Sequence, residues 1–317
     1  MKIVVLDGYA GNPGDLSWKK LKELGECAIY DRTSTDEIVT RAKDADAVLT
    51  NKVPLDSTII AALPKLKYIG ILATGVNVVD IEAAKKHGIV VTNVPNYCTD
   101  SVAQFVFAHL FNICCHVRHY TTEIRDGKWS HCKDFSYFNT PIVELAGKTM
   151  GIVGLGNIGM QVARMALVMN MKVQAYTSKE QKDLPEGITK AELDDLFKTS
   201  DVVSLHCPLT PATEHMVNRK RLHSMKAHAI LINTSRGGLV NEADLADCLD
   251  KGGLLGAGID VMEQEPPQLD NPLLRARNCY ITPHIAWASK EARIRLMDEI
   301  VKNLKGYIDG KPVNVVK

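Results

Sequence analysis

The sequence predicts an α/β protein built from two doubly wound parallel sheets. Three observations lead to this prediction: a length of 317 residues, two series of short strand-like runs alternating with helical stretches, and a glycine-rich turn near the start of the second series. At roughly 150 residues per domain, the chain corresponds to two domains, each large enough to bury its own core. Alternation of strands and helices is typical of parallel sheets, because parallel neighbours need a crossover connection.

The first series occupies the first hundred residues and predicts a small open α/β domain. Its β-rich runs are 2–6, 27–30, 47–50, 68–72 and 89–93. Its helical stretches are 16–24, 36–43, 57–63 and 81–86. Gly88 follows the last helix closely, as expected of a helix stop signal.

After the first series, the sequence predicts a long helix. Ser101 followed three residues later by Gln104 is a capping-box signature, and an apolar face then continues to residue 117. Six strands follow, at 149–153, 172–176, 202–206, 229–233, 255–259 and 279–282. A last long helix is predicted over 289–308.

Composition excludes several classes of protein. Thirty-eight Lys and Arg against 37 Asp and Glu leave a net charge of +1, so no global field attracts nucleic acid or an anionic membrane. The apolar run at the start of the sequence is too short for a signal peptide, and no segment has the length of a membrane span. Eight cysteines without a CxxC pair suit reduced thiols. We therefore expect a cytoplasmic protein that binds neither nucleic acid nor membrane.

A phosphate-binding loop is predicted at the first strand of the second series. Gly154-Leu155-Gly156-Asn157-Ile158-Gly159 follows the strand 149–153 and opens a helix. In this context Gly154 permits a tight turn, Gly156 lets a pyrophosphate approach the backbone, and Gly159 allows close packing of helix on strand. The free N–H groups of the helix N-terminus would bind the phosphates. The loop predicts a dinucleotide cofactor.

The end of the second strand of this series bears on which dinucleotide binds. An Asp or Glu there would bind the ribose 2′-hydroxyl of NAD(H), but this chain has Thr177, Ser178 and Lys179. With two hydroxyls and an ammonium in place of a carboxylate, the sequence favours NADP(H) slightly over NAD(H). The alternative is that Lys179 is only a solvated charge.

Three titratable or charged residues follow strands of the second series. They are Arg236, in Asn-Thr-Ser-Arg-Gly-Gly, Glu265, and His284, in Pro-His-Ile-Ala-Trp. Ligands bind at the carboxyl ends of strands in open α/β sheets. Together the three supply a fork for an anion, a proton donor and a carboxylate to hold that donor, as reduction of a 2-keto acid requires.

These motifs resemble those of the D-isomer-specific 2-hydroxyacid dehydrogenases over nearly the whole chain. The resemblance rests on the glycine fingerprint, on residues 206–210, on the block around Arg236, on Asp260-Val261 with Glu265-Pro266, and on 283–287. Within the family, residues 51–53, 73–77 and 284–289 are most similar to the glycerate dehydrogenase, or hydroxypyruvate reductase, branch. The departure from the family pattern is Thr177 in place of the usual acid.

The resemblance implies a fold and a reaction. A Rossmann NAD(P)-binding domain, 101–285, would be inserted in a flavodoxin-like substrate domain, 1–100 plus 286–317. The enzyme would transfer a hydride between NAD(P)H and a small 2-keto acid, converting hydroxypyruvate or glyoxylate to D-glycerate or glycolate. The family is also expected to form homodimers built around the cofactor domains.

The resemblance further implies a role for each matching residue. Arg236 would bind the substrate carboxylate, His284 would be the acid/base, and Glu265 would tune His284 by hydrogen bonding to its imidazole. The remaining substrate contacts would be Asn51, Lys52, Thr74 and Gly75. The cofactor would be bound by Gly154, Gly156, Asn157, Ile158, Gly159, Thr177, Ser178, Lys179, Cys207, Pro208, Thr213, Thr234, Ser235, Asp260, His284 and Trp287.

Other interpretations remain open at this point. A phosphoglycerate dehydrogenase shares these motifs, and so does a non-catalytic NAD(H)-sensing binding protein of the corepressor type.

The segment Cys114-Cys115-His116, with His119 and His131-Cys132, contains the ligand types of zinc. Its spacing favours ordinary packing and exposed histidines instead, and we expect no metal.

Overall fold

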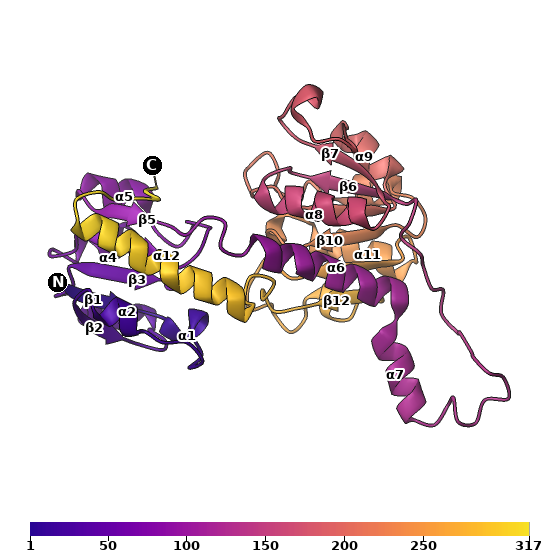
Figure 1. The fold of residues 1–317 in the computed structure, drawn as a ribbon, viewed down its shortest axis with the longest axis horizontal. Coiled ribbons are helices and arrows are strands. Elements are labelled where there is room, and N and C mark those ends of the chain that lie inside the picture. The colour runs from indigo at the N-terminus through magenta and orange to yellow at the C-terminus, as the bar shows by residue number, and fades with distance from the viewer. Residues whose placement is uncertain (317) are drawn as a thin grey trace. The chain divides into compact units, whose positions relative to one another are not determined.

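The computed structural model describes residues 1–316, and the chain divides into two compact units. Unit 1 comprises Met1–Cys98 and Ala288–Lys317, and unit 2 comprises Thr99–Trp287. The chain therefore passes from one unit to the other twice (Figure 1). No helix within residues 1–316 is both long enough and apolar enough to cross a membrane.

Unit 1 contains a five-stranded parallel sheet in the order β2-β1-β3-β4-β5. This is the flavodoxin-like order, in which the direction of winding reverses between β1 and β3. The strands are β1 (Lys2–Val5), β2 (Glu26–Ile29), β3 (Ala47–Thr50), β4 (Tyr68–Ile71) and β5 (Val90–Thr92).

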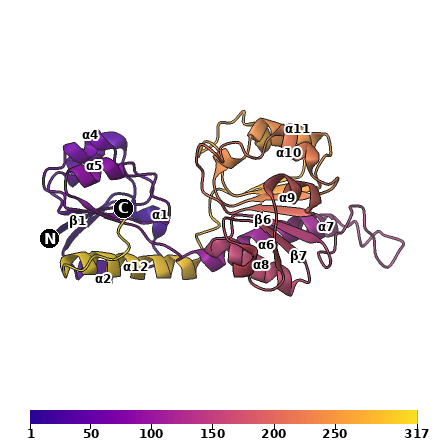
Figure 2. The same ribbon diagram turned by 90° about the horizontal axis from the view of Figure 1, so that it is seen from above.

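Helices cover both faces of the unit 1 sheet. Helices α4 and α5 lie on one face and α2 and α12 on the other (Figure 2). The ring of Tyr68 on β4 lies 4.9 Å from the ring of Tyr307 on α12, which fixes that helix to the sheet. The helices of unit 1 are α1 (Gly8–Gly11), α2 (Lys19–Lys22), α3 (Ile38–Ala42), α4 (Ser57–Ala61), α5 (Ile81–Lys86) and α12 (Lys290–Ile308), with the 3-10 turn η1 (Thr35–Glu37).

Unit 2 contains a seven-stranded parallel sheet in the order β12-β11-β10-β9-β6-β7-β8. Counted from β6, six of these strands follow the doubly wound dinucleotide-binding order, and winding reverses between β6 and β9. The strands are β6 (Thr149–Val153), β7 (Lys172–Tyr176), β8 (Ile188–Lys190), β9 (Val202–Leu205), β10 (Ile230–Asn233), β11 (Gly256–Ile259) and β12 (Cys279–Ile281).

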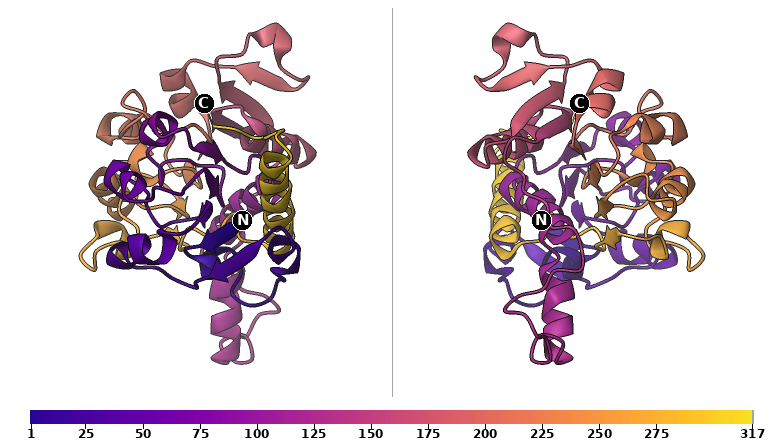
Figure 3. Two further views of the ribbon diagram at one scale, coloured as in Figure 1. Left: turned by 90° about the vertical axis from the view of Figure 1, so that its left-hand side faces the viewer. Right: turned by 90° about the vertical axis from the view of Figure 1, so that its right-hand side faces the viewer.

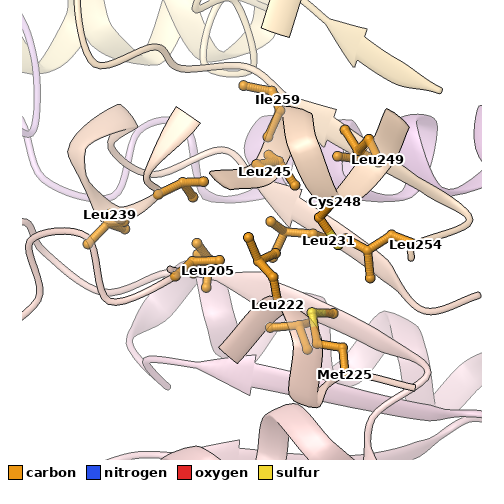
Figure 4. Close-up of a cluster of buried hydrophobic side chains, with 14 of the residues drawn as sticks. Leu205, Leu222, Met225, Leu231, Leu239, Leu245, Cys248, Leu249, Leu254 and Ile259 are labelled. Carbon is orange, nitrogen blue, oxygen red and sulfur yellow. The ribbon is translucent and has the colours of Figure 1, made fainter. Parts of the chain in front are cut away.

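Two apolar clusters hold the helices of unit 2 on the sheet. One packs α6 and α8 on one face, and the other packs α9, α10 and α11 on the opposite face (Figures 2 and 4). In the second cluster, Leu222 of α10 and Leu245 of α11 meet Leu205 and Leu231 of the sheet. The helices are α6 (Thr99–Cys115), α7 (Val117–Arg125), α8 (Asn157–Val168), α9 (Leu193–Thr199), α10 (Arg219–Ser224) and α11 (Glu242–Asp250), with 3-10 turns η2 (Gln181–Asp183), η3 (Gly237–Leu239) and η4 (Pro272–Leu274).

The predicted fold class of two doubly wound parallel sheets is confirmed, with local differences. The short strand β8 was not predicted, because three residues give almost no periodic signal. The expected helix 16–24 is only the four residues of α2. The long helix is interrupted at His116, whose φ of 51° is left-handed, and α7 begins after it.

The capping role expected of Ser101 is wrong. Helix α6 begins at Thr99, so Ser101 lies inside its first turn. Its hydroxyl donates a hydrogen bond to the carbonyl of Ala286 at 2.6 Å instead. A tertiary partner therefore takes the side chain that the local pattern assigned to the helix end.

Candidate active site

The glycine loop of unit 2 lies where β6 ends and α8 begins. Gly154 has a φ of +95°, and a Cβ atom there would lie 2.7 Å from the carbonyl oxygen of His206. A Cβ at Gly159 would lie 2.1 Å from the carbonyl oxygen of Gly154. Both positions need glycine, for the turn and for close packing of the helix.

Gly156 is different, because no atom lies within 4 Å of the place where its Cβ would be. It is exposed, and it is the N-cap of α8, a twelve-residue helix whose N-terminal N–H groups would face an anion at this position. The loop thus combines a tight internal turn with an open outer face. This geometry fits the pyrophosphate of a dinucleotide.

A second observation supports the fit. Thr234 Oγ1 is buried and has no hydrogen-bond partner in the described residues. Such an atom costs free energy unless a ligand or water satisfies it. Thr234 follows β10, the second strand from β6 on the side of β9. The residues present therefore fit a dinucleotide at the carboxyl edge of the sheet.

The strand ends on either side of β6 contribute polar groups. After β7, Thr177 is half-buried and Ser178 and Lys179 are exposed, and the N–H of Lys179 donates to Thr177 Oγ1 at 3.3 Å. After β9, the carbonyl of Cys207 accepts a hydrogen bond from Ser235 Oγ at 2.7 Å. Thr213 is placed beside the same turn. Its hydroxyl donates to the carbonyl of Pro208 at 2.8 Å.

His284 and Glu265 are brought together as predicted. His284 Nδ1 lies 2.6 Å from Glu265 Oε2. The other carboxylate oxygen, Oε1, accepts a hydrogen bond from the N–H of Met262 at 3.0 Å, which orients the Glu265 side chain. The carbonyl of His284 accepts a hydrogen bond from Trp287 Nε1 at 2.9 Å. An imidazole held by a carboxylate at Nδ1 is suited to transfer a proton at Nε2.

Arg236 follows β10, and the segment bearing Glu265 follows β11, so Arg236, Glu265 and His284 come after three adjacent strands. Arg236 is half-buried, and its Nη1 donates to the carbonyl of Ser235 at 2.7 Å. A Cβ at the neighbouring Gly237 would lie 1.9 Å from the backbone of Met262. Gly237 therefore lets the loop after β10 pack directly on the loop after β11.

Asp260, expected to contact the cofactor, is only 1% exposed and accepts hydrogen bonds from this chain. Its Oδ1 accepts from Thr282 Oγ1 at 2.6 Å and from the N–H of Ile285 at 2.9 Å. Its Oδ2 accepts from the N–H of Ala286 at 2.9 Å. In this structure the carboxylate holds the segment that contains His284.

In unit 1, the expected substrate residues follow β3 and β4. Asn51 is buried, and its Nδ2 donates to the carbonyl of Leu72 at 2.7 Å, which links the two strand ends. Thr74 Oγ1 donates to the carbonyl of Val94 at 2.9 Å. Lys52 and Thr74 are exposed and Gly75 is half-buried, so all three can meet solvent.

Asp7, which follows β1, was not among the residues predicted from the sequence. Its buried carboxylate accepts hydrogen bonds from the N–H groups of Asn51 at 2.8 Å, Lys52 at 2.5 Å and Val53 at 3.3 Å. Burial raises the pKa of this carboxyl group, and the three N–H groups and the Lys52 charge oppose that rise. An acid at the strand where winding reverses was the available signal.

The segment 114–132, which contains the cysteines and histidines considered as zinc ligands, has no group of side chains arranged to bind a metal ion. Within residues 1–316 no three His, Cys, Asp or Glu side chains are placed to share an ion. His119 Nε2 lies 3.1 Å from Asn139 Oδ1, and His131 Nδ1 lies 2.7 Å from the carbonyl of Gly127.

Comparison with known proteins gives the family. Residues 107–286 match the model of the NAD binding domain of D-isomer specific 2-hydroxyacid dehydrogenases. The chain belongs to the D-isomer specific 2-hydroxyacid dehydrogenase family. It is therefore an oxidoreductase of CH–OH donors with an NAD-binding domain in unit 2, and the resemblance seen in the sequence is confirmed.

Relatives within this dehydrogenase family cover the chain almost completely. A hydroxypyruvate reductase from Blautia hydrogenotrophica is 49% identical over 320 residues, covering 100% of this chain and 99% of the relative. A glycerate dehydrogenase from Methylorubrum extorquens is 43% identical over 291 residues, covering 91% of each chain. Among solved structures, an acyclic imino acid reductase in complex with NADPH and D-Arg superimposes with a TM-score of 0.87 at 32% identity, covering 100% of both chains.

Proposed function

We propose that the protein reduces hydroxypyruvate or glyoxylate to D-glycerate or glycolate with NAD(P)H. The observation that carries this proposal is the 2.6 Å pair of His284 and Glu265. These two residues and Arg236 come after adjacent strands, at the same edge of the sheet. An acid/base and an anion-binding fork at one edge are what a 2-keto acid needs. The hydroxypyruvate reductase and glycerate dehydrogenase among the relatives support the choice of substrate.

Each residue has a distinct role in this proposal. Arg236 binds the substrate carboxylate and its 2-oxygen. Lys52, Thr74 and Gly75 supply further donors to the carboxylate, and Asn51 belongs to the same substrate-binding surface, where its amide fixes the turn before Lys52. When bound, the reduced nicotinamide supplies the hydride for the keto carbon. His284 gives its Nε2 proton to the oxygen, where negative charge grows, so the product is the hydroxyl. Glu265 keeps Nδ1 in place throughout, because its own orientation is fixed by Met262.

The cofactor is bound by the remaining predicted residues. Gly154, Gly156, Asn157, Ile158 and Gly159 face the pyrophosphate. Cys207, Pro208, Thr213, Thr234, Ser235, Asp260, His284 and Trp287 belong to the rest of the binding surface.

We propose a modest preference for NADP(H), since Thr177, Ser178 and Lys179 place hydroxyls and an ammonium, and no carboxylate, after β7. The NADPH bound to the imino acid reductase shows that this fold accepts that cofactor in a relative. Lys179→Ala should raise the Kd for NADPH and leave that for NADH nearly unchanged. Exposed Lys182→Ala is the matched control. A strong preference of the unmodified protein for NADH would contradict the proposal.

A substrate panel run with both cofactors tests the reaction. Hydroxypyruvate, glyoxylate, pyruvate and 3-phosphohydroxypyruvate are each mixed with protein and reduced cofactor, and the loss of absorbance at the nicotinamide band is followed. We expect turnover with the first two, abolished in His284→Ala. Preference for the phosphorylated substrate would favour a phosphoglycerate dehydrogenase. Cofactor binding without turnover of any 2-keto acid would refute the proposal and favour a binding protein.

We also propose that the protein is a homodimer that associates through α7 and the segment after it. This part extends away from the body of unit 2 (Figure 3). It exposes large apolar side chains that a monomer would leave in water. They are Val117, Ile124, Trp129, Phe135, Phe138 and Ile142. Light scattering should give twice the chain mass, and Phe135→Ser with Phe138→Ser should give a monomer.

A further inference from the structure

A buried chain of polar groups runs from helix α6 to the segment that contains His284. His109 of α6 is only 5% exposed, and its Nε2 lies 3.2 Å from Thr282 Oγ1. Thr282 Oγ1 donates its proton to Asp260 Oδ1 at 2.6 Å. A hydroxyl has one proton to give, so Thr282 must accept from His109, and Nε2 of His109 carries a proton. Neither His109 nor Thr282 has a role in the chemistry proposed above.

The other end of this chain is a set of backbone groups on both sides of the reactive imidazole. The Asp260 carboxylate accepts from the N–H groups of Ile285 and Ala286, each at 2.9 Å. The Asp260 carbonyl accepts from the N–H of His284 at 2.8 Å. Three consecutive N–H groups, 284 to 286, therefore end on one residue.

The backbone of His284 needs such support. Its φ is +54°, in the left-handed region that residues other than glycine seldom occupy. Such a conformation persists only where its surroundings impose it. The Asp260 contacts are part of those surroundings, together with the Thr282 carbonyl, which also accepts from the His284 N–H at 3.0 Å.

A glycine of the sheet makes room for His109. A Cβ atom at Gly258 of β11 would lie 2.6 Å from Cβ of His109, so this glycine lets α6 approach closely enough for the ring to reach Thr282. Burial lowers the pKa of His109, against the opposing charge of Asp260, and this favours a neutral ring. A neutral ring with its proton on Nε2 is the form that the hydrogen bonds require.

We propose that His109 and Thr282 are positioning residues, which fix the Asp260 carboxylate so that it holds the backbone of Ile285 and Ala286, and with it the preceding His284 imidazole, in the reactive orientation. The inference rests on the proposed keto acid reduction. It assigns no proton transfer with substrate to either residue.

Two pairs of variants test the proposal in the full-length protein. Thr282→Val removes the hydroxyl at constant size and should lower kcat by about 10- to 100-fold, as expected of a reacting group displaced by a fraction of an ångström. The KM for the keto acid should change less than kcat. Thr282→Ser should restore kcat. Likewise His109→Gln, which keeps a donor, should retain more kcat than His109→Leu. An unchanged kcat in both Thr282→Val and His109→Leu would overturn the proposal.

Hydrogen exchange provides a readout that does not need turnover. In Thr282→Val the amides of Ile285 and Ala286 should exchange faster, because they donate to the Asp260 carboxylate, while amides of β6 keep their protection. Unchanged exchange at Ile285 and Ala286 would also overturn the proposal, since the network would then not hold this segment. If the unmodified protein binds cofactor but reduces no 2-keto acid, the proposed function fails by itself, and exchange still reports on the network.

Discussion

Asp7 Oδ1 lies 2.8 Å from the backbone nitrogen of Asn51, inside unit 1 and between the ends of two adjacent strands. The same carboxylate accepts from the N–H groups of Lys52 and Val53. One buried acid thus shapes the turn that carries two of the proposed substrate residues. Asp7 stabilises this turn through hydrogen bonds to its backbone and need not contact the substrate itself.

Replacing Asp7 by Ala should therefore weaken both folding and substrate binding. Three N–H groups would lose their acceptor, and at about 1–3 kcal/mol for a buried unsatisfied group we expect the free energy of unfolding to fall by at least about 2 kcal/mol. The KM for the keto acid should rise more than kcat falls. Urea unfolding and steady-state kinetics measure the two effects. The exposed Asp31→Ala is the control, and an unaltered KM in a folded Asp7 variant would contradict the assignment.

Glu265→Gln should reduce turnover without disturbing its loop. The amide oxygen of Gln can still accept from the N–H of Met262, whereas the charge beside His284 Nδ1 is lost. We expect kcat to fall by about 100-fold, within the range for general acid–base catalysis. Glu263→Gln is a matched control, because Glu263 makes a similar 2.8 Å pair with His215. Equal losses in both variants would argue against a specific role for Glu265.

Two glycines of one loop should respond differently to alanine. Gly156→Ala meets no atom within 4 Å, so the folded protein should keep its melting temperature but bind NAD(P)H at least about 10-fold more weakly, since the methyl group occupies the pyrophosphate side. Gly159→Ala places Cβ 2.1 Å from the Gly154 carbonyl and should lower the melting temperature. Calorimetry and fluorescence titration distinguish the two. Tight cofactor binding by Gly156→Ala would contradict the assignment of this loop to the cofactor site.

Stability should fall as the solution becomes acidic, partly through His206. Burial lowers the pKa of His206 to about 3, and its Nε2 lies 2.8 Å from Ser204 Oγ. Above pH 6.5 the ring is neutral in both states and has no effect. Below that pH the unfolded chain takes up a proton that the folded chain does not, so the free energy of unfolding decreases by at most about 1.4 kcal/mol per pH unit. Urea titrations from pH 7 to 4.5 should show a smaller decrease in His206→Gln.

Much of the fold could be predicted from the sequence, because long apolar runs and glycine signals are strong local patterns. The strand before Gly154 and the helix after it are examples. Features decided by distant partners could not. Ser101 has the local pattern of a helix cap, yet its hydroxyl finds the Ala286 carbonyl, 185 positions away in sequence. The left-handed break at His116 has no glycine to announce it.

The site follows the same division. His284 and Glu265 were predicted to pair, and the structure brings them together because they follow adjacent strands. Asp7, His109 and Thr282 were missed, since each acts through backbone or buried groups of other elements and belongs to no motif. Strand order, which places the ends of β1 and β3 side by side, is the information that would have revealed Asp7.

The hydrogen bond between Ser101 and Ala286 also bears on how such a chain can be rearranged. It joins the third residue of unit 2 to its next-to-last one, so the two ends of this unit lie side by side. A segment with adjoining ends has the geometry of a cassette: it can be excised, transplanted into another host or circularly permuted without stretching its backbone. The NAD-binding unit of this enzyme therefore has the end-to-end geometry of a module that recombination can move as one continuous segment.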